Sequence, residues 1–476
     1  MILPKTFDLD RKTVCIQGLG FVGSAMALAV AYAKGADNKP LYNVIGIDVP
    51  NEAGHKKADS LNSGVFPFEN NDKNLQNALE EVTNAGNFIA VTDSEYFKYA
   101  DVVVVDINLD VKYDDSQEPF LDLSMFEDAM HTLGRYIKEG TLVIVETTVP
   151  PGTCKKVVYP AICSEFEVRG LDKEKIFIAH SYERVMPGEN YFNSIINFWR
   201  VFSGINTASA DKCEEFLRTV ISTDEYPLTR LDNTNSTEIA KVLENSYRAT
   251  TIAFMEEWGR FAEEIGVDLF EVIDAIRVRP THSNMRQPGF GVGGYCLTKD
   301  PYFAKLAAKD LFNIDGMDFP FCTMAVKTNN KMPIVSLDKI EEYFGGSVNG
   351  KNILVMGVSY RQDVGDTRYS PSEIFIKEAL KRGANIIAQD PLVDEWPEME
   401  LEVLHDIPDF SNYDAIVFTV QHKQYRDLDF NEFSYKEGAL IFDSNYVLTT
   451  EQRNQIDKMK AGKSVYFKSI GRGEKE

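Results

Sequence analysis

The chain of 476 residues has few cysteines and histidines, and neither type forms a ligand pattern. The six cysteines are scattered without a CxxC pair, and the six histidines lack HExxH-like spacing. Zinc sites and disulfide frameworks both depend on such spacing. The sequence therefore predicts no metal site and a reducing compartment, in which thiols stay free.

Long hydrophobic runs and a basic excess are also missing. The apolar runs, such as Val102–Val105, are all far too short to span a bilayer, and the N-terminal residues lack the basic and then apolar order of a signal peptide. Acidic residues number 73 against 50 basic ones, which gives a formal charge of −23 and disfavours a nucleic acid partner. We therefore expect a cytoplasmic protein that binds neither nucleic acid nor membrane.

The composition is that of a globular protein, with 44% hydrophobic and 26% charged residues. Short apolar runs alternate with helix-like segments towards both ends of the chain. The expected strands are TVCIQG, VIGIDV, FIAVTD, DVVVVDI and TLVIVETT in the first half, and NILVMG, NIIAQDP, DAIVFTV and GALIFDSN in the second. Such alternation predicts βαβ units, hence an α/β protein with two doubly wound, Rossmann-like parallel-sheet domains.

A long helix is predicted between these domains, over residues 236–265. The segment has no proline and a single glycine, and large apolar residues recur every three or four positions. These residues are Ile239, Leu243, Tyr247, Phe254, Trp258, Phe261 and Ile265. A helix of this length is a natural dimer spine, and a buried connecting helix without an oligomeric role is the alternative. The predicted domains are 1–215, a central helical dimerisation segment 216–335, and 336–476.

A glycine turn follows the first expected strand. Gly18 allows the tight turn, Gly20 lets the backbone approach a pyrophosphate, and Gly23 lets the helix pack on the strand. Asp48 ends the next strand and is placed to accept hydrogen bonds from ribose hydroxyls, which favours NAD over NADP. The predicted NAD-binding residues are Gly18, Gly20, Phe21, Val22, Gly23 and Asp48. The alternative is a turn needed only for packing, with Asp48 as a solvated strand end.

A second glycine-rich loop, residues 287–301, surrounds Cys296. Gly289, Gly291, Gly293 and Gly294 precede the thiol, and Lys299 and Asp300 follow it. Such a loop can wrap its backbone round a ligand, and a nearby cation favours the reactive thiolate. The alternative is a buried, inert cysteine, which is our expectation for the other five.

Six motifs in order make the chain resemble the UDP-glucose/GDP-mannose dehydrogenase family over essentially its whole length. They are GLGFVG, ETTVPPGT, SYERVMPGEN, STEIAKVLENSYRATTIAF, GFGVGGYCLTKDP and GVSYRQDVGDTRYSP. The ERVMPG and LENSYR segments look closest to the branch that oxidises UDP-N-acetylhexosamines. The resemblance implies an NAD-binding domain, a central dimerisation domain with the cysteine loop, a C-terminal nucleotide-sugar-binding domain and a homodimer.

The resemblance also implies a four-electron oxidation of a sugar C6 hydroxymethyl group to a carboxylate. Cys296 would carry the thiohemiacetal and thioester. Lys241 and Asn245, four residues apart on one helix face, would stabilise oxyanion charge. Glu183 would act as general base on the hydrolytic water, and Thr148 would hold a water or hydroxyl nearby and border the cofactor.

Further substrate-site residues follow from the same resemblance. Asp300 would be a second base or a partner for Lys241, and Arg361 would meet the nucleotide phosphates. The remaining implied substrate contacts are Glu183, Arg184, Lys241, Asn245, Gly291, Gly293 and Gly294.

The sequence departs from the family at three places. Asp106-Ile-Asn-Leu109 stands where many members have a Pro-Thr-Pro turn beside the cofactor. His282 lies near the position of an arginine that reaches into the partner subunit's site, which Arg279 or Arg286 could replace. IFDSNYVL lacks an arginine after its aspartate.

Two other functions remain open from sequence. A two-electron dehydrogenase of the β-hydroxyacid type would keep the glycine turn and the central helix but has no use for Cys296. A non-catalytic nucleotide-sugar-binding protein would be expected to lack Cys296, Lys241 or Asn245, and all three are present.

Overall fold

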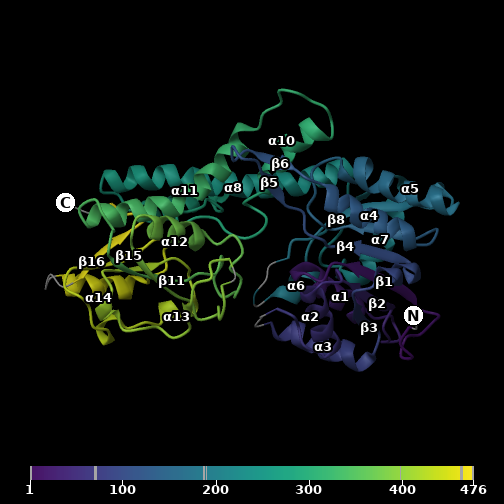
Figure 1. The fold of residues 1–476 in the computed structure, drawn as a ribbon, viewed down its shortest axis with the longest axis horizontal. Coiled ribbons are helices and arrows are strands. Elements are labelled where there is room, and N and C mark those ends of the chain that lie inside the picture. Colours follow the sequence, from purple (N-terminus) through teal and green to yellow (C-terminus); the bar gives the residue numbers. More distant parts are fainter. Residues whose placement is uncertain are drawn as a thin grey trace. The chain divides into compact units, whose positions relative to one another are not determined.

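The structure is a computed structural model that describes residues 3–68, 72–185, 188, 190–396, 398–460 and 465–473. The chain divides into two compact units. The first comprises Met1–Leu243 and Tyr302–Asp318, and the second Glu244–Pro301 and Phe319–Glu476. Each unit contains one large sheet flanked by helices (Figure 1), which confirms the predicted α/β class. The three domain boundaries given above stay a prediction.

The first unit contains an eight-stranded sheet in the order β10-β9-β8-β7-β4-β1-β2-β3. Its strands are β1 (Lys12–Gln17), β2 (Tyr42–Ile47), β3 (Phe88–Val91), β4 (Val102–Val105), β7 (Leu142–Val145), β8 (Phe177–Tyr182), β9 (Val201–Gly204) and β10 (Thr229–Arg230). All neighbours pair in parallel except β8 and β9. The sequence predicted the first five strands and missed the last three, which are short or contain several polar residues.

The apolar runs become central strands because helices cover both faces of the sheet. All residues of β2, β4 and β7 are buried, so these strands read as continuous rather than alternating hydrophobic runs. β1 has β2 on one side and β4 on the other. The strand order therefore reverses between β1 and β4, and ligands bind at such a switch point, beyond the carboxyl ends of the strands.

The helices of the first unit follow the usual α/β pattern of one helix after most strands. They are α1 (Phe21–Tyr32), α2 (Glu52–Asn62), α3 (Lys73–Ala85), α4 (Ser124–Tyr136), α5 (Tyr159–Arg169), α6 (Tyr191–Ile196) and α7 (Thr207–Val220). α1 is almost wholly buried, because α3, α6 and α7 join it in one hydrophobic core on the sheet. A small antiparallel pair, β5 (Val111–Tyr113) with β6 (Pro119–Leu121), follows β4.

The second unit contains a six-stranded, all-parallel sheet in the order β13-β12-β11-β14-β15-β16. Its strands are β11 (Asn352–Met356), β12 (Asn385–Gln389), β13 (Val403–Leu404), β14 (Ala415–Phe418), β15 (Ala439–Asp443) and β16 (Val465–Ser469). Separate hydrophobic cores cover its two faces. The order reverses between β11 and β14, so this sheet has its own switch point. The four strands predicted in this half are confirmed.

Helices make up the rest of the second unit. They are α9 (Leu269–Arg277), α11 (Pro320–Tyr343), α12 (Pro371–Lys381), α13 (Lys423–Arg426) and α14 (Thr450–Lys460). α8 (Thr234–Glu264) and α10 (Asp300–Asp310) each contain residues of both units. α8 is the predicted long helix, shifted by two residues at its start and one at its end.

The large apolar residues predicted along α8 are exposed. Ile239, Leu243, Tyr247, Phe254, Trp258, Phe261 and Ile265 have exposed fractions between 49% and 63%. A buried connecting helix would hide these side chains, so that alternative is wrong for this face of the helix.

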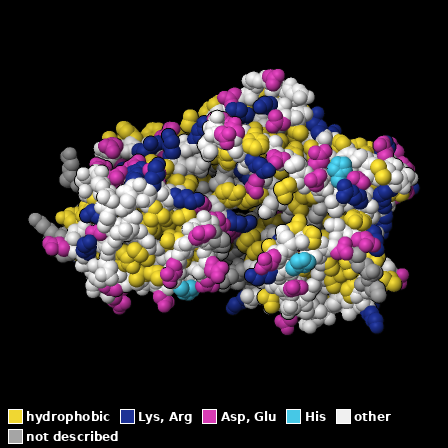
Figure 2. All heavy atoms as spheres, in the orientation of Figure 1, with side chains coloured by type: hydrophobic (Ala, Val, Ile, Leu, Met, Phe, Trp, Pro, Cys, Tyr) yellow, Lys and Arg dark blue, Asp and Glu magenta, His cyan; other side chains and the backbone are white. Residues whose placement is uncertain are grey.

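The surface carries charges of both signs. Figure 2 shows acidic and basic side chains interspersed on the face drawn, with apolar side chains between them. None of the helices in the described part of the chain is long and apolar enough to cross a bilayer. Within the same residues, histidine, cysteine and acidic side chains form no group of three suited to a metal ion.

Candidate active site

The glycine turn after β1 has the shape that a dinucleotide requires. Gly18 has a φ of +94°, and a Cβ there would lie 2.6 Å from the carbonyl oxygen of Asp106. A Cβ on Gly23 would lie 1.9 Å from the Gly18 carbonyl oxygen, so only glycine lets α1 pack this closely. A Cβ on Gly20 would meet nothing within 4 Å. The turn is tight on the protein side and open at Gly20, where a pyrophosphate can approach the start of α1.

Asp48 lies beside this turn, directly after β2. Its carboxylate accepts hydrogen bonds from the N–H groups of Leu19 at 3.0 Å and Val49 at 2.7 Å, and it forms an ion pair with Lys57. Asp48 is therefore an ordered carboxylate held against the turn rather than a solvated strand end. The residues fit a dinucleotide whose ribose hydroxyls meet Asp48.

Glu183 and Lys241 are brought together in the first unit. Glu183 directly follows β8, and the Lys241 Nζ donates to its backbone oxygen at 2.7 Å and lies 3.6 Å from its carboxylate Oε1. Arg184 instead donates to the Trp199 carbonyl oxygen at 2.9 Å. Met186, Pro187 and Glu189 of the same motif lie outside the described residues.

Thr148 lies on a loop that is fixed at both ends. The preceding residue, Thr147, donates its hydroxyl to the Ile107 carbonyl oxygen at 2.8 Å. Further along, the N–H groups of Gly152 and Cys154 donate to Glu238 of α8 at 2.6 and 2.8 Å. Thr148 itself is half-buried. The loop after β7 is thus tied to α8, the helix that carries Lys241.

A buried ion pair in the first unit was not predicted from the sequence. Arg200 Nη1 lies 2.7 Å from Glu146 Oε1, and both side chains are almost completely inaccessible. The carboxyl group of Asp106 lies within electrostatic range of Glu146, Glu183 and Arg200. Nothing in the sequence spacing pairs residues 146 and 200, because the contact depends on how β7 and β9 lie in the sheet.

Cys296 of the second unit is half-buried and lies four positions before the first residue of α10. Its carbonyl oxygen accepts the N–H of Asp300 at 2.9 Å. The buried Asp300 carboxylate accepts the amide of Asn245 at 2.7 Å and lies 2.9 Å from the Nζ of Lys299. Asn245, Lys299 and Asp300 therefore form one hydrogen-bonded group at the base of the cysteine loop.

The glycines of the cysteine loop pack against the second unit itself. A Cβ on Gly289 would lie 2.6 Å from Asn445 Oδ1, and one on Gly294 2.7 Å from the ring of Tyr360. A Cβ on Gly293 would lie 2.7 Å from the Tyr360 Cβ. The expectation that all four glycines wrap round a ligand thus leaves out their close contacts with the protein itself. Gly291 lines a cavity, whereas the other three let the loop approach neighbouring segments.

Arg248 lies within electrostatic range of Cys296 and of two other arginines. The pKa of Arg248 is lowered by burial and by the positive charges of Arg286 and Arg361, whereas Cys296 acts in the opposite direction. Arg248 lies three positions beyond Asn245 on α8, a spacing that places both on one helix face. The sequence reasoning missed Arg248, although this spacing was visible. Of His282, Arg279 and Arg286, the structure brings Arg286 to this cationic group.

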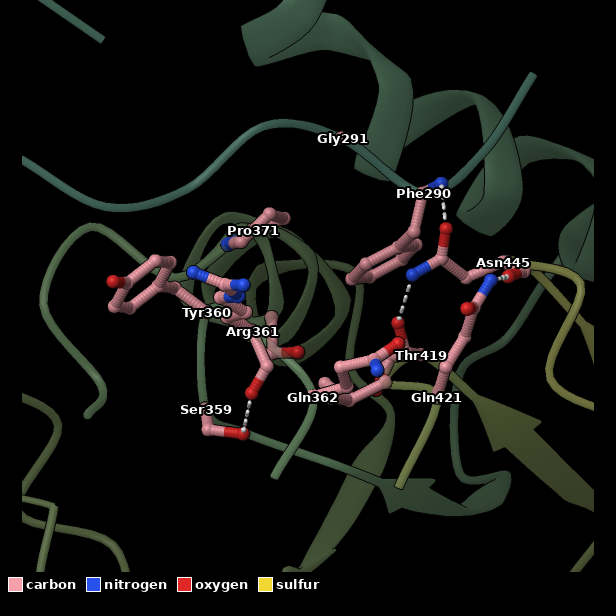
Figure 3. Close-up of a pocket in the computed structure, with 12 residues that line it drawn as sticks. Phe290, Gly291, Ser359, Tyr360, Arg361, Gln362, Pro371, Thr419, Gln421 and Asn445 are labelled. Carbon is pink, nitrogen blue, oxygen red and sulfur yellow. Dashed lines mark hydrogen bonds between the residues drawn. The ribbon is translucent and has the colours of Figure 1, made fainter. Parts of the chain in front are cut away.

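A cavity of about 410 Å³ opens at the switch point of the second sheet. Figure 3 shows Tyr360 and Arg361 at one end and Gln421 and Asn445 at the other. The Asn445 amide donates to the Thr419 carbonyl oxygen at 2.8 Å, and Gln421 donates to the Asn445 carbonyl oxygen at 2.6 Å. The cavity thus has a cationic end and an amide-rich end, as a nucleoside diphosphate would require.

The other five cysteines differ from Cys296. Cys15, Cys154 and Cys213 are buried, and burial raises the pKa of each thiol. The expected burial is wrong for Cys163 and Cys322, which are half-buried. Cys296 is therefore marked by its loop and its charged neighbours rather than by exposure alone.

Comparison with known families identifies three matching segments. Residues 12–221, 235–331 and 354–450 match the NAD binding, central and UDP binding domains of the UDP-glucose/GDP-mannose dehydrogenase family, in that order. The chain is 28% identical over 445 residues to a UDP-N-acetyl-D-mannosamine dehydrogenase of Methanocaldococcus jannaschii, which covers 92% of this chain and 93% of that protein.

Two further similarities extend over most of the chain. One is to an NDP-N-acetyl-D-galactosaminuronic acid dehydrogenase of Ralstonia nicotianae, 26% identical over 434 residues, or 90% of this chain and 95% of that protein. The other is to the crystal structure of an NDP-N-acetyl-D-galactosaminuronic acid dehydrogenase from Methanosarcina mazei, with a TM-score of 0.78 and 26% identity. That match covers 98% of this chain and 96% of the solved one.

Proposed function

Because the chain belongs to the UDP-glucose/GDP-mannose dehydrogenase family and is an NAD-dependent nucleotide-sugar dehydrogenase, we propose that it oxidises a sugar C6 hydroxymethyl group to a carboxylate in two NAD-dependent steps. The observation that carries the proposal is the environment of Cys296. This half-buried thiol lies beside an ordered Asn245–Asp300–Lys299 group and within electrostatic range of Arg248. A two-electron dehydrogenase has no use for such a thiol.

The proposed course begins with oxidation of the alcohol to the aldehyde, and bound NAD supplies the hydride acceptor. The Cys296 thiolate then adds to the aldehyde carbon to form a thiohemiacetal. A second hydride transfer, to a second NAD, converts this adduct into a thioester. Water displaces the thiolate and leaves the carboxylate, so each substrate yields two NADH.

Four polar residues are proposed to support these steps. Lys241 and Asn245, four positions apart on α8, stabilise oxyanion charge on the reacting carbon. Glu183 activates the hydrolytic water, and its contact with Lys241 orients its carboxylate. Asp300, held by Asn245 and Lys299, orients Asn245 and remains the second candidate base. Thr148 holds a water or hydroxyl near Glu183.

The proposed substrate is a UDP-N-acetylhexosamine, with UDP-glucose as the second candidate. The relatives named above act on N-acetylated nucleotide sugars by name, and the C-terminal match is to a UDP binding domain. The cavity at the second switch point offers Arg361 for the phosphates and Gln421 and Asn445 for polar groups of the nucleoside. Gly291, which also lines this cavity, brings the cysteine loop to the bound nucleotide.

Stoichiometry tests the proposed reaction directly. NADH formed per nucleotide sugar consumed should be about two, over a panel of UDP- and GDP-sugars, because alcohol-to-acid oxidation removes four electrons. A ratio of one with an aldehyde product would contradict it. Cys296→Ser should abolish turnover and leave NAD binding unchanged, while Cys322→Ser serves as the matched control. Mass spectrometry of quenched wild-type enzyme should find an acyl adduct on Cys296.

The chain is further proposed to form a homodimer through α8. Seven large apolar side chains with exposed fractions between 49% and 63% follow this helix, and an apolar strip of this length needs a partner. Analytical ultracentrifugation should find a dimer that Trp258→Arg converts to monomer. Val168→Arg, at a residue that is 84% exposed on α5, provides the control. A monomeric wild type would contradict the proposal.

We place this enzyme in the cytoplasm as a proposal. All six cysteines are free thiols in the structure, which fits a reducing compartment. Fractionation of cells that express the native protein tests this directly, and recovery with secreted proteins would contradict it.

A further inference from the structure

His422 is a buried residue of the second unit that the reaction course above leaves unused. It directly precedes α13, and its side chain is completely shielded from solvent. Its imidazole ring contacts the loop of residues 359–366, which follows β11 and carries Arg361 to the cavity drawn in Figure 3. The ring packs edge-on against Tyr425, with 5.4 Å between the ring centroids, so its orientation is fixed.

The imidazole meets the chain on both sides of Arg361. Its Nε2 lies 3.0 Å from the hydroxyl oxygen of Ser359, two positions before the arginine. Its Nδ1 accepts the N–H of Asp363 at 3.0 Å, two positions after the arginine. Because the Asp363 N–H points at Nδ1, that nitrogen carries no proton and Nε2 is the donor. The neutral ring therefore joins both ends of the turn that contains Arg361.

The acids beside the ring have other partners of their own. Nε2 also lies 3.1 Å from Asp390, whose carboxylate already accepts three backbone N–H groups. Asp363 Oδ1 lies 3.8 Å from Nδ1 and accepts the Lys423 N–H at 3.1 Å. Ser359 and Asp390 meet the same ring nitrogen, so these side chains are not arranged as a nucleophilic triad, in which the acid meets the other nitrogen. The ring thus acts on the loop through its hydrogen bonds.

Asp363 needs this support because its backbone conformation is unusual. Its φ of +56° lies in the left-handed region, which residues other than glycine rarely adopt. Its N–H donates to His422, and its carboxylate accepts the N–H of Lys423. On the other side of the turn, Ser359 donates its hydroxyl to the Arg361 carbonyl oxygen at 3.1 Å. The backbone of the turn is therefore fixed both before and after the arginine.

The Arg361 side chain depends on this backbone for its direction. It is exposed, and among the described residues none forms a hydrogen bond or ion pair with its guanidinium group. A preorganised turn lowers the entropy that is lost when a diphosphate binds such a cation. We propose that His422 is a positioning residue, which fixes Asp363 and thereby holds Arg361 towards the diphosphate of the bound nucleotide. The inference rests on the role proposed above for Arg361 in phosphate binding.

Two substitutions separate the two ring nitrogens. The amide oxygen of His422→Asn can replace Nδ1 and accept the Asp363 N–H, whereas the amide of His422→Gln reaches only the position of Nε2. Calorimetric titration of the full-length enzyme with UDP should find His422→Asn within about threefold of the wild-type affinity. His422→Gln should lose about tenfold, because Asp363 is released and Arg361 is no longer held. His405→Gln, the same change at an exposed histidine of the second unit, should bind UDP as the wild type does.

A double-mutant cycle distinguishes positioning from a general loss of structure. In the Arg361→Ala background, His422→Gln should change UDP affinity by less than about twofold, because no guanidinium group is left to hold. NAD affinity, measured in the same way, should equal that of the wild type in every variant. A similar loss of UDP affinity in both backgrounds would overturn the proposal, as would equal losses in His422→Asn and His422→Gln.

His422→Leu is the second variant if His422→Gln does not fold. Leucine fills the same buried space without a polar atom, so it also releases Asp363 and should show the same loss of UDP affinity. Wild-type UDP affinity in a folded His422→Leu would overturn the proposal. If Arg361→Ala binds UDP as tightly as the wild type, the phosphate contact itself is wrong, and the inference falls with it.

Discussion

The two Rossmann-like sheets share the order of their central strands but differ in how they can bind an anion. In both, an aspartate after the second strand accepts hydrogen bonds from the turn after the first strand. Asp48 accepts the Leu19 N–H at 3.0 Å, and Asp390 accepts the N–H groups of Val358 and Ser359 at 2.8 and 3.0 Å. The two switch points are therefore built on the same hydrogen-bonding scheme.

The difference lies in the segment that comes after each turn. After Gly20 the chain enters α1 at once, so the free N–H groups of a helix start face the ligand. After Ser359 the chain continues as a loop until α12 begins at Pro371, and Arg361 of that loop lines the cavity. The common topology thus sets where a nucleotide binds. The local turn decides whether backbone dipoles or side-chain charges hold its phosphates.

The largest effect should come from closing the first turn. In Gly23→Ala the added Cβ would lie 1.9 Å from the Gly18 carbonyl oxygen, so α1 must move. NAD affinity should fall at least about a hundredfold, while UDP binding to the second unit stays within about twofold. Isothermal titration with each ligand checks this. Gly20→Ala should keep the thermal stability of the wild type and lose NAD affinity only, because its Cβ points into open space. Unchanged NAD binding by Gly23→Ala would contradict the assignment of the turn.

A smaller effect is expected from Arg361 in the second sheet. Arg361→Ala should weaken UDP binding about 30- to 100-fold, because a charge-assisted contact to phosphate is lost, and NAD binding should not change. Arg361→Lys should recover part of the affinity as a point charge. Arg368→Gln is the control, since Asp366 already pairs with Arg368 at 2.7 Å. If Arg361→Ala and Arg368→Gln lost equal UDP affinity, Arg361 would have no special role in holding the phosphates. The proposed difference between the two sheets in phosphate binding would then be wrong.

The cysteine loop should show a still smaller, reversible effect. Gly289→Ala places a Cβ 2.6 Å from Asn445 Oδ1 and should lower kcat about tenfold by displacing the loop. The double variant Gly289→Ala/Asn445→Ala removes this clash and should recover most of the loss. Asn445→Ala alone loses the amide bonds to Thr419 and Phe290 and the proposed contact with the nucleoside, which should raise KM rather than lower kcat. A double variant that is slower than either single variant would exclude this contact as the cause.

The sequence predicted the parts of the fold that depend on local patterns. The continuous apolar runs of β2, β4 and β7, the turn at Gly18 and the length of α8 all follow from short-range spacing. The three strands β8–β10 were missed because they are short or partly polar. The reversed direction of β9 and β10 depends on the sheet rather than on their own residues.

The candidate site was predicted unevenly for the same physical reason. Cys296, Lys241 and Asn245 lie in motifs, so a family resemblance could select them. The Glu146–Arg200 pair arises only when distant strand ends meet. Arg248 was predictable from its spacing to Asn245. The contact of Gly289 with Asn445 was not, because glycine-rich sequence does not reveal which neighbour occupies the vacant Cβ position.

The smallest effects are expected at two buried glutamates of α8. Backbone N–H groups stabilise the carboxylate of one, and a side-chain cation faces the carboxylate of the other. Glu238 accepts two backbone N–H groups, whereas Glu256 lies 3.5 Å from Arg260. Burial raises the pKa of each to about 7. Because the folded pKa exceeds that of the unfolded chain, each group stabilises most below about pH 4.5, and this contribution is lost as the pH rises through 7.

Glutamine substitutions at these two positions should therefore change stability in opposite directions. Glu256→Gln should raise the free energy of unfolding at pH 8 by on the order of 2 kcal/mol and leave it nearly unchanged near pH 4.5, because it removes a buried charge. Glu238→Gln should lower it by about 1 to 3 kcal/mol at pH 8, because its amide group cannot accept from both backbone donors. Denaturant unfolding at the two pH values measures both. Destabilisation of equal size in both variants would mean that Arg260 holds Glu256 as firmly as the backbone holds Glu238.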